Sequence, residues 1–301
     1  MAIPFRQLEV FRAVGETASF TRASHILFIS QSTVSQHIRE LEDRLKVRLL
    51  DRNRRRVALT PAGAALLEHA RRVFRQLEEA EAAVQTGGDP YSGKLCFGCA
   101  STTLLYLLPP VLIEYARKYP EVELSIMGGT IQEVSAQLWA GALDFALVVL
   151  PLAAPGLAKT PLFEEPLLAV LPARHRLAAR PRLTIQDLAG ERFILHRPGQ
   201  NTRKLIDRFF FRHKIAPRVI VELAETETIK EMVAHGLGVS LLPASALSGR
   251  QAGTGLKTFR IAGKELARTL ALVHLRPRAL RPPAAAMIEL LQRHFASRAG
   301  A

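Results

Sequence analysis

Residues 19–45, which read SFTRASHILFISQSTVSQHIRELEDRL, decide the fold of the N-terminal part of the chain. The pattern predicts two helices joined by a tight turn, and Ser30 is a suitable N-cap for the second helix. One side of this second helix is apolar at spacings of three and four, and it needs a core to cover it: Val34, Ile38, Leu41 and Leu45. Another side carries hydrogen-bonding side chains that suit base edges and phosphates in a DNA major groove. The residues expected to contact DNA there are Gln31, Ser32, Thr33, Ser35, Gln36 and Arg39.

A dense basic segment follows this helix directly. Between Arg44 and Arg56 there are seven basic residues against the single acid Asp51. A solvated charge run is the alternative, but the neighbouring helix favours a wing that contacts the DNA backbone through Arg52, Arg54, Arg55 and Arg56. The net charge of +14 is a weaker indicator, because residues 1–86 carry only +4 of it and the rest of the chain carries +10.

The same region resembles a known family. FRQLEVFRAVGETASFTRAS (5–24) and ISQSTVSQHIRELEDRLKVRLLDRNRRRVALTPAGAALL (29–67) are similar to the N-terminal winged helix-turn-helix of the LysR-type transcriptional regulators. Ser32 stands where the family often has proline, and Lys46 stands where it usually has glycine. The resemblance covers residues 3–86 in detail, and it implies a sequence-specific DNA-binding regulator.

Residues 61–86 are expected to form one long helix, which Thr60 caps and Pro61 begins. Its apolar residues follow a heptad pattern that favours dimerisation, although a helix packed on its own domain is the alternative. The predicted dimer residues are Leu66, Ala70, Val73, Leu77, Ala80 and Val84. A two-fold dimer would place two recognition helices on a pseudo-palindromic site in double-stranded DNA.

Beyond a Gly- and Pro-containing hinge at 87–92, short apolar strands alternate with helices, which favours an α/β fold with a mostly parallel sheet. The family resemblance implies two α/β subdomains like those of periplasmic-binding-protein folds, with the chain crossing between them twice. The expected organisation is therefore a winged helix-turn-helix domain at 1–60, a linker helix at 61–86, and subdomains at 93–164 with 268–301 and at 165–267. The crossings are expected near Glu164 to Pro166 and near Ala267 to Thr269.

A small-molecule effector is expected between the subdomains, where three strand-to-helix turns supply hydroxyls, amides and helix N-termini. Because these groups outnumber carboxylates, we expect an anionic effector. Simple helix capping is the alternative for Ser101 to Thr103 and for Thr130, and a hydrogen-bonded structural role is the alternative for His196. The candidate effector-binding residues are Ser101, Thr102, Thr103, Thr130, His196, Asn201, Thr202 and Thr226.

The remaining features exclude other classes of protein. Cys96 and Cys99 have C-x-x-C spacing but lie in a strand-like segment without further ligands, so neither a metal site nor another cofactor is expected. G-x-S-x-G, P-loop, H-E-x-x-H and G-x-G-x-x-G motifs are absent, which argues against an enzyme. A ligand-free architectural DNA-binding protein would leave the large α/β portion without a use. No apolar run or secretory signal suggests membrane insertion or export, so a cytoplasmic protein is expected, with RNA polymerase as a possible partner and a tetramer implied by the resemblance.

Overall fold

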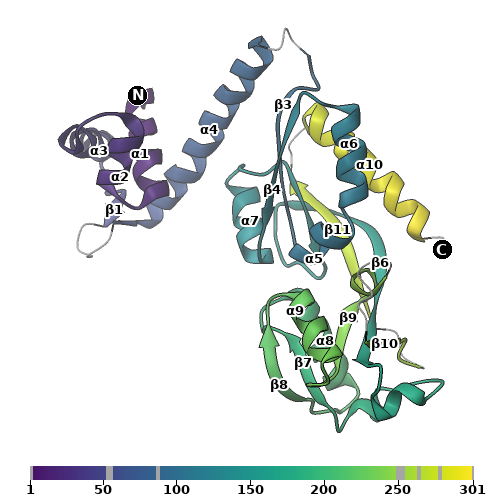
Figure 1. Ribbon diagram of the computed structural model, residues 1–301. Helices are drawn as coiled ribbons and strands as arrows, with labels where there is room; N and C mark the ends of the chain where they lie inside the picture. The colour runs from purple at the N-terminus through teal and green to yellow at the C-terminus, as the bar shows by residue number, and fades with distance from the viewer. Residues whose placement is uncertain are drawn as a thin grey trace. The chain divides into compact units, whose positions relative to one another are not determined.

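The computed structural model describes residues 3–51, 57–85, 89–248, 255–262, 266–276 and 280–299 (Figure 1). The chain divides into two compact units. The N-terminal unit extends to Lys94 and includes the segment Ala136–Leu143, and the second unit comprises 95–135 and 144–301.

The N-terminal unit begins with a helix-turn-helix. Its elements are α1 (Phe5–Thr17), α2 (Phe20–Leu27), α3 (Gln31–Leu45), the short antiparallel strands β1 (Leu50–Asp51) and β2 (Ala58–Leu59), and the long helix α4 (Pro61–Gln85). The Ser30 hydroxyl accepts a hydrogen bond from the N–H of Thr33 at 3.1 Å, which confirms it as the N-cap of α3. Helices α2 and α3 each end at a residue in the left-handed conformation, Phe28 and Lys46.

The core of this unit covers the apolar stripe of α3. Val34, Ile38 and Leu41 are fully buried against α1 residues such as Phe11, while Leu45 packs on the same core and remains half-buried. The stripe predicted from the sequence is therefore confirmed, and its burial turns the polar side of α3 away from the core.

The second unit alternates strands and helices. Its first half contains β3 (Gly93–Cys99), α5 (Ser101–Tyr106), α6 (Pro109–Lys118), β4 (Val122–Gly128), the first part of α7 (Ile131–Trp139), whose residues from Ala136 onward belong to the N-terminal unit, and β5 (Phe145–Val149). The chain continues through β6 (Leu157–Pro172), two 3-10 turns, β7 (Arg192–His196), α8 (Asn201–Arg212), β8 (Arg218–Leu223), α9 (Thr226–Ala234) and β9 (Ser240–Pro243). A third 3-10 turn, β10 (Leu256–Phe259), β11 (Ala267–Leu275) and α10 (Pro282–Ala299) complete it.

The sheets of this unit are mixed rather than mostly parallel. A seven-stranded sheet has the order β10-β6-β11-β5-β3-β4, with β9 also pairing to β6, and β7 pairs with β8 in a separate sheet. The β3–β5 and β7–β8 pairs are parallel, but β11 is antiparallel to both β5 and β6, and β6 is antiparallel to β9 and β10. The sequence prediction needs this correction because β6 and β11 run in opposite directions where they are neighbours.

Strand β6 belongs to both halves of the unit. Its first part pairs with β11 from Leu157 to Pro166, and its last part pairs with β9 and β10. Glu165 on β6 lies directly opposite Arg268 on β11. Both residues fall within or beside the segments where the sequence predicted that the chain crosses between subdomains.

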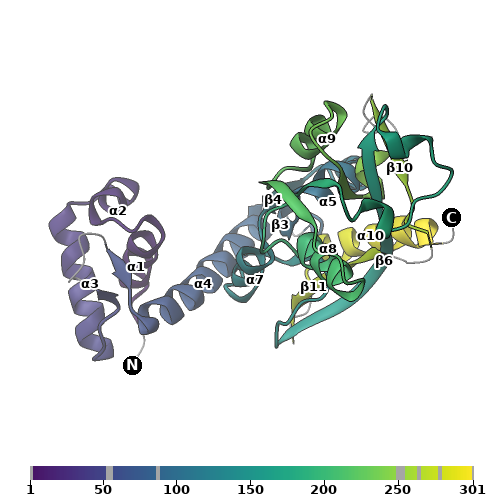
Figure 2. The same ribbon diagram turned by 90° about the horizontal axis from the view of Figure 1, so that it is seen from below.

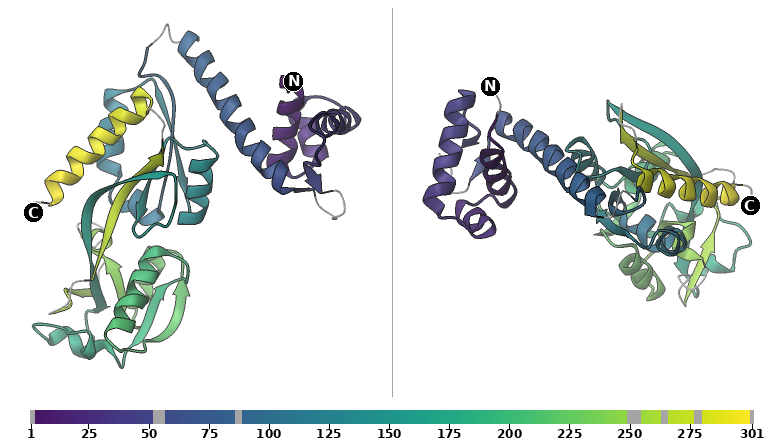
Figure 3. Two further views of the ribbon diagram at one scale, coloured as in Figure 1. Left: turned by 180° about the vertical axis from the view of Figure 1, so that it is seen from behind. Right: turned by 90° about the horizontal axis from the view of Figure 1, so that it is seen from above.

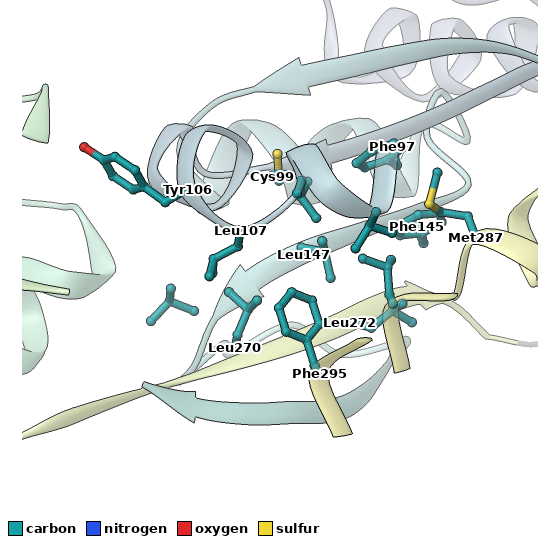
Figure 4. Close-up of a cluster of buried hydrophobic side chains, with 14 of the residues drawn as sticks. Phe97, Cys99, Tyr106, Leu107, Phe145, Leu147, Leu270, Leu272, Met287 and Phe295 are labelled. Atoms are coloured by element: carbon teal, nitrogen blue, oxygen red, sulfur yellow. The ribbon is translucent and has the colours of Figure 1, made fainter. Parts of the chain in front are cut away.

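Two hydrophobic cores stabilise this unit, and the larger one includes residues of both halves, such as Leu147 and Ile229. The larger core joins the first sheet to α6 and α10, which lie side by side on one face of that sheet in Figures 1 and 3. Figure 4 shows part of it, where Phe97 and Phe145 stack with ring centroids 4.9 Å apart. The smaller core packs α8, through side chains such as Phe209 and Phe210, against the strands of the second half, which Figure 2 shows from below. Among the described residues, no helix combines the length and apolarity needed to cross a membrane.

The apolar pattern of the sequence predicts one helix over residues 103–118, but the structure has two helices there. Helix α5 ends at Tyr106 and α6 begins at Pro109. Pro109 and Pro110 lack the N–H groups that a continuous helix would donate to the carbonyls of the preceding turn, so the helix is interrupted.

Candidate DNA-binding and effector sites

Helix α3 presents the predicted DNA-contacting residues away from its core face. Gln31, Ser32, Gln36 and Arg39 are exposed, and Thr33 and Ser35 are half-buried. The Gln36 amide donates to the Glu40 carboxylate at 2.9 Å, and the Arg39 Nε donates to the Ser35 carbonyl at 3.3 Å. The hydrogen bonds from Gln36 and then Gln7 lower the pKa of Glu40, which stays ionised beside the polar face.

Glu42 has a structural role beside the candidate DNA-binding face that the sequence does not predict. Its side chain is buried, and one carboxylate oxygen accepts the backbone N–H groups of Leu49 and Leu50 at 2.8 and 3.1 Å. The other oxygen accepts from Arg48 at 3.0 Å. Glu42 thus ties the end of α3 to the first strand of the wing. Charged residues are usually exposed to solvent, so the sequence gives no indication that Glu42 is buried.

The wing is fixed on its other side by the start of α4. The Thr60 hydroxyl donates to the Arg48 carbonyl at 2.7 Å and accepts from the N–H of Gly63 at 3.0 Å, which confirms the predicted cap. A Cβ atom on Gly63 would lie 2.0 Å from the carbonyl oxygen of Leu49, so only glycine allows this approach. The predicted wing residues Arg52, Arg54, Arg55 and Arg56 lie outside the described residues.

Helix α4 divides into a packed part and an exposed part. Leu67, Ala70 and Phe74 are buried within the N-terminal unit, and Arg12 lies over the Phe74 ring at 4.0 Å. Of the predicted dimer residues, Leu66 is half-buried against the same cores and Ala70 is fully buried. This placement corrects the role predicted for Ala70, which packs on Leu8 and Phe74 of its own chain. The exposed members are Val73, Leu77, Ala80 and Val84.

A cavity of ≈260 Å³ lies between the two halves of the second unit. Six of the eight candidate effector residues line it: Ser101, Thr102, Thr130, His196, Asn201 and Thr202. Thr103 is completely buried and is not among the residues that line the cavity. Thr226 is also buried, and it lies behind His196 rather than at the cavity wall. These two placements correct the sequence prediction.

Arg268 is the most important residue that the sequence analysis missed. Its side chain is 1% exposed and lines the cavity. The Nε atom donates to Glu165 at 2.7 Å, while one terminal nitrogen lies 3.2 Å from the Thr102 hydroxyl and 3.5 Å from the Thr202 hydroxyl. Arg268 therefore joins residues of both halves at the cavity. The only indication in the sequence is that Arg268 lies in the predicted crossing at 267–269. That indication concerns the path of the chain and does not point to a buried charge.

Glu165 compensates the charge of Arg268. It is also buried, and its second oxygen accepts the N–H of Ser245 at 2.7 Å. A buried guanidinium needs such a partner, because an uncompensated buried charge is strongly destabilising. The pair keeps Arg268 fixed with one terminal nitrogen directed at the two threonine hydroxyls.

His196 contributes a neutral imidazole to the cavity wall. Burial first, and then the charges of Arg268 and Arg203, lower the pKa of His196 to about 4. Its Nε2 lies 2.9 Å from the Thr226 hydroxyl, and its Nδ1 has no hydrogen-bond partner among the described residues. If the Thr226 hydroxyl donates to Nε2, the imidazole proton lies on Nδ1.

The helix N-termini around the cavity differ in whether their backbone N–H groups are capped. The N-cap of α8, Gln200, makes no capping hydrogen bond with its side chain, which leaves backbone N–H groups of α8 at the cavity. The Asn201 amide instead donates to the carbonyls of Val149 and Pro151, so it links the two halves. Thr130 caps α7 through a reciprocal pair with Glu133, at 3.3 and 2.7 Å, in agreement with the capping alternative.

The two cysteines lie on β3, and neither is among the residues that line the cavity. Neither cysteine forms a disulfide, and burial raises the pKa of Cys99 to about 12. Among the described residues, no group of three or more histidine, cysteine or acidic side chains could hold a metal ion.

Family models match both parts of the chain. Residues 5–64 match the bacterial regulatory helix-turn-helix protein model of the lysR family, and residues 88–296 match the LysR substrate binding domain. The chain belongs to the LysR family of DNA-binding transcriptional regulators. Its members bind DNA, form oligomers and respond to small molecules through the substrate binding domain, and they are not enzymes.

Individual relatives agree with this assignment. The chain is 33% identical over 269 residues to a hydrogen peroxide-inducible genes activator of Pectobacterium carotovorum, covering 89% of each protein. It is 31% identical over 296 residues to the HTH-type transcriptional regulator CfxR of Cupriavidus necator, covering 98% of this chain and 93% of CfxR.

Solved structures share the fold. Full-length OxyR from Pseudomonas aeruginosa superposes with a TM-score of 0.75 at 28% identity, covering 98% of this chain and 95% of that one. The CcmR regulatory domain of Synechocystis PCC6803, solved in complex with 2-PG, superposes with a TM-score of 0.63 at 26% identity, covering 68% of this chain and 98% of that domain.

Proposed function

We propose that this regulator is controlled by a small anionic effector that binds in the cavity beside Arg268. The observation that carries the proposal is the buried guanidinium with one nitrogen directed between the hydroxyls of Thr102 and Thr202. A planar guanidinium with hydroxyl neighbours suits a carboxylate or phosphate group. The uncapped N-terminus of α8 and the neutral His196 add N–H donors without a competing acceptor charge.

The carboxylates at the cavity wall limit where the anionic group can bind. Glu133 and Glu225 also line the cavity, and Glu133 is held by the backbone N–H of Thr130, which lowers its pKa. An anion is therefore expected at the Arg268 end, and the remainder of the effector would extend toward these acids. The bound 2-PG of the CcmR domain supports a small-molecule effector in a regulatory domain of this kind.

On the DNA side, the proposal assigns base contacts to the exposed polar face of α3. Arg39 and Gln36 would reach base edges or phosphates, and Glu42 would hold the wing strand in place to contact the backbone. Dimerisation through the exposed stripe of α4, and a tetramer of two such dimers, would give a pseudo-palindromic recognition site. The hinge at 87–92 and the subdomain limits near 165 and 268 belong to the same proposal.

Peroxide sensing is a second candidate, because relatives are named as hydrogen peroxide-inducible activators. Thiol-based sensing requires an accessible cysteine with a lowered pKa. The sequence has two cysteines, and on β3 the pKa of Cys99 is raised by burial instead. The cavity around Arg268 therefore favours effector binding over thiol oxidation.

The proposal is tested by a thermal-shift panel of phosphate, sulfate, phosphate monoesters and small carboxylates. An anion at ~100 times its dissociation constant stabilises the protein by ~2.7 kcal/mol, a shift of roughly 5–10 °C. Thr202→Val and Thr102→Val should each weaken that anion about 5- to 30-fold by removing one hydroxyl. Thr103→Val is the matched control, because Thr103 does not line the cavity and should bind the anion normally. Stabilisation only by neutral compounds would contradict the anionic assignment.

A further inference from the structure

The basic charge of the chain is concentrated in a part that the DNA-binding domain does not explain. Residues 165–267 contain 17 Lys and Arg against nine Asp and Glu, a net of +8, whereas residues 1–86 carry +4. Part of this excess lies on α8, and neither DNA recognition by α3 nor the effector cavity accounts for it.

Helix α8 gathers cations on its exposed side. Lys204, Arg208 and Arg212 are exposed at spacing i, i+4, i+8, which places them on one helix face. Within the part of the chain that the structure describes, none of the three forms an ion pair, while the neighbouring Arg203 is paired with Asp207 and Glu222. Successive cations are ~6 Å apart along the helix axis, so the row spans ~12 Å.

An exposed aromatic ring lies at the edge of this basic face. Phe211 is 86% exposed and lies about 20° from Lys204 around the helix, on the side away from Arg208 and Arg212. Cations at a helix C-terminus also stabilise the helix dipole, but that effect gives no reason for an exposed phenylalanine. A row of cations with an aromatic ring is the pattern of a nucleic-acid surface.

We propose that the exposed face of α8, formed by Lys204, Arg208, Phe211 and Arg212, is an auxiliary contact for the phosphate backbone of double-stranded DNA. A polyphosphate offers regularly repeated charges that a row of three cations can follow, whereas a protein partner would need a matching row of acids. The contact carries no sequence preference, because it involves phosphates rather than base edges. It adds to the affinity of the helix-turn-helix and does not depend on the effector.

The test is the salt dependence of binding of the full chain to a random-sequence duplex of about 60 base pairs. The triple variant Lys204→Ala/Arg208→Ala/Arg212→Ala should reduce the slope of log K against log salt by about 2 to 3, because each lost phosphate contact removes ~0.9. The control Arg117→Ala/Lys118→Ala/Arg276→Ala removes three exposed charges elsewhere in the same unit and should leave the slope close to that of the wild type.

Two further variants distinguish the loss of charge from a disturbance of the fold. Arg208→Lys/Arg212→Lys keeps the charge and should keep the wild-type slope, while Phe211→Ala should weaken binding a few-fold with the slope unchanged. Equal slopes for the triple variant and its control would overturn the proposal. Loss of binding to polyglutamate without any change on DNA would also overturn it, and would assign the surface to an acidic protein.

Discussion

At the scale of single residues, His196 makes stability depend on pH in a defined direction. Its folded pKa of about 4 lies below the ordinary value of 6.5, so the unfolded chain binds a proton that the folded chain rejects. Neutral His196 therefore contributes fully to the free energy of unfolding above pH 6.5. This contribution is lost as the pH falls toward 4, and the loss between pH 7 and pH 5 is about 2 kcal/mol. In urea unfolding, the free energy of unfolding should differ less between these two pH values for His196→Gln than for the wild type.

The control for that measurement is His235→Gln. His235 is exposed, so its replacement should leave the acid sensitivity of the wild type unchanged. If His196→Gln and the wild type lose the same stability between pH 7 and pH 5, the imidazole is not buried in neutral form as the structure has it.

The residues that the sequence did not predict share one physical property. Glu42 and Arg268 are charged side chains whose burial depends on partners outside their own helix or strand, seven residues away for Glu42 and 103 residues away for Arg268. Residue type alone favours the surface for both. Threonines at helix starts were easier to predict, because capping is local, but Thr103 and Thr226 show that a hydroxyl in such a turn can face the core instead.

At the scale of elements, the wing depends on a close approach of α4 to the segment before β1. Gly63→Ala would place a Cβ 2.0 Å from the Leu49 carbonyl and should destabilise the N-terminal unit by about 1–3 kcal/mol, despite the better helix propensity of alanine. Gly15→Ala is the matched control, because its Cβ would meet only the flexible end of Leu67 at 3.0 Å. Chemical unfolding of the two variants should therefore give clearly different midpoints.

Local sequence patterns predict most helices and strands, but they fail where pairing with a distant strand determines the secondary structure. The apolar pattern predicts strands at 93–99 and 192–196, which are the bounds of β3 and β7, and a helix after Ser30, which is α3. The first part of β6, Leu157–Pro166, was missed because its sequence AKTPLFEEP contains two prolines and little alternation. Pairing with β11 makes it a strand, and no local signal reports that partner.

At the scale of the whole molecule, assembly is expected through the exposed stripe of α4. Val73→Asp/Leu77→Asp should shift the protein toward monomers in light-scattering measurements at micromolar concentration, because charges would enter an apolar interface. Ala65→Glu adds a charge on a different exposed side of the same helix and should leave the oligomer intact. A dimer that persists in the double variant would place the main interface in another part of the chain.

The paired crossing strands have a mechanical consequence. Glu165 and Arg268 face each other on a two-stranded antiparallel ribbon that connects the halves of the regulatory unit. Such a ribbon resists stretching and shear through its hydrogen bonds more than it resists torsion, so we expect any relative movement of the halves to be a rotation about this ribbon. The cavity lies beside that ribbon, where the lever arm is short. A ligand that displaces Arg268 by a fraction of an ångström would therefore displace the distant edges of the two halves by a larger distance.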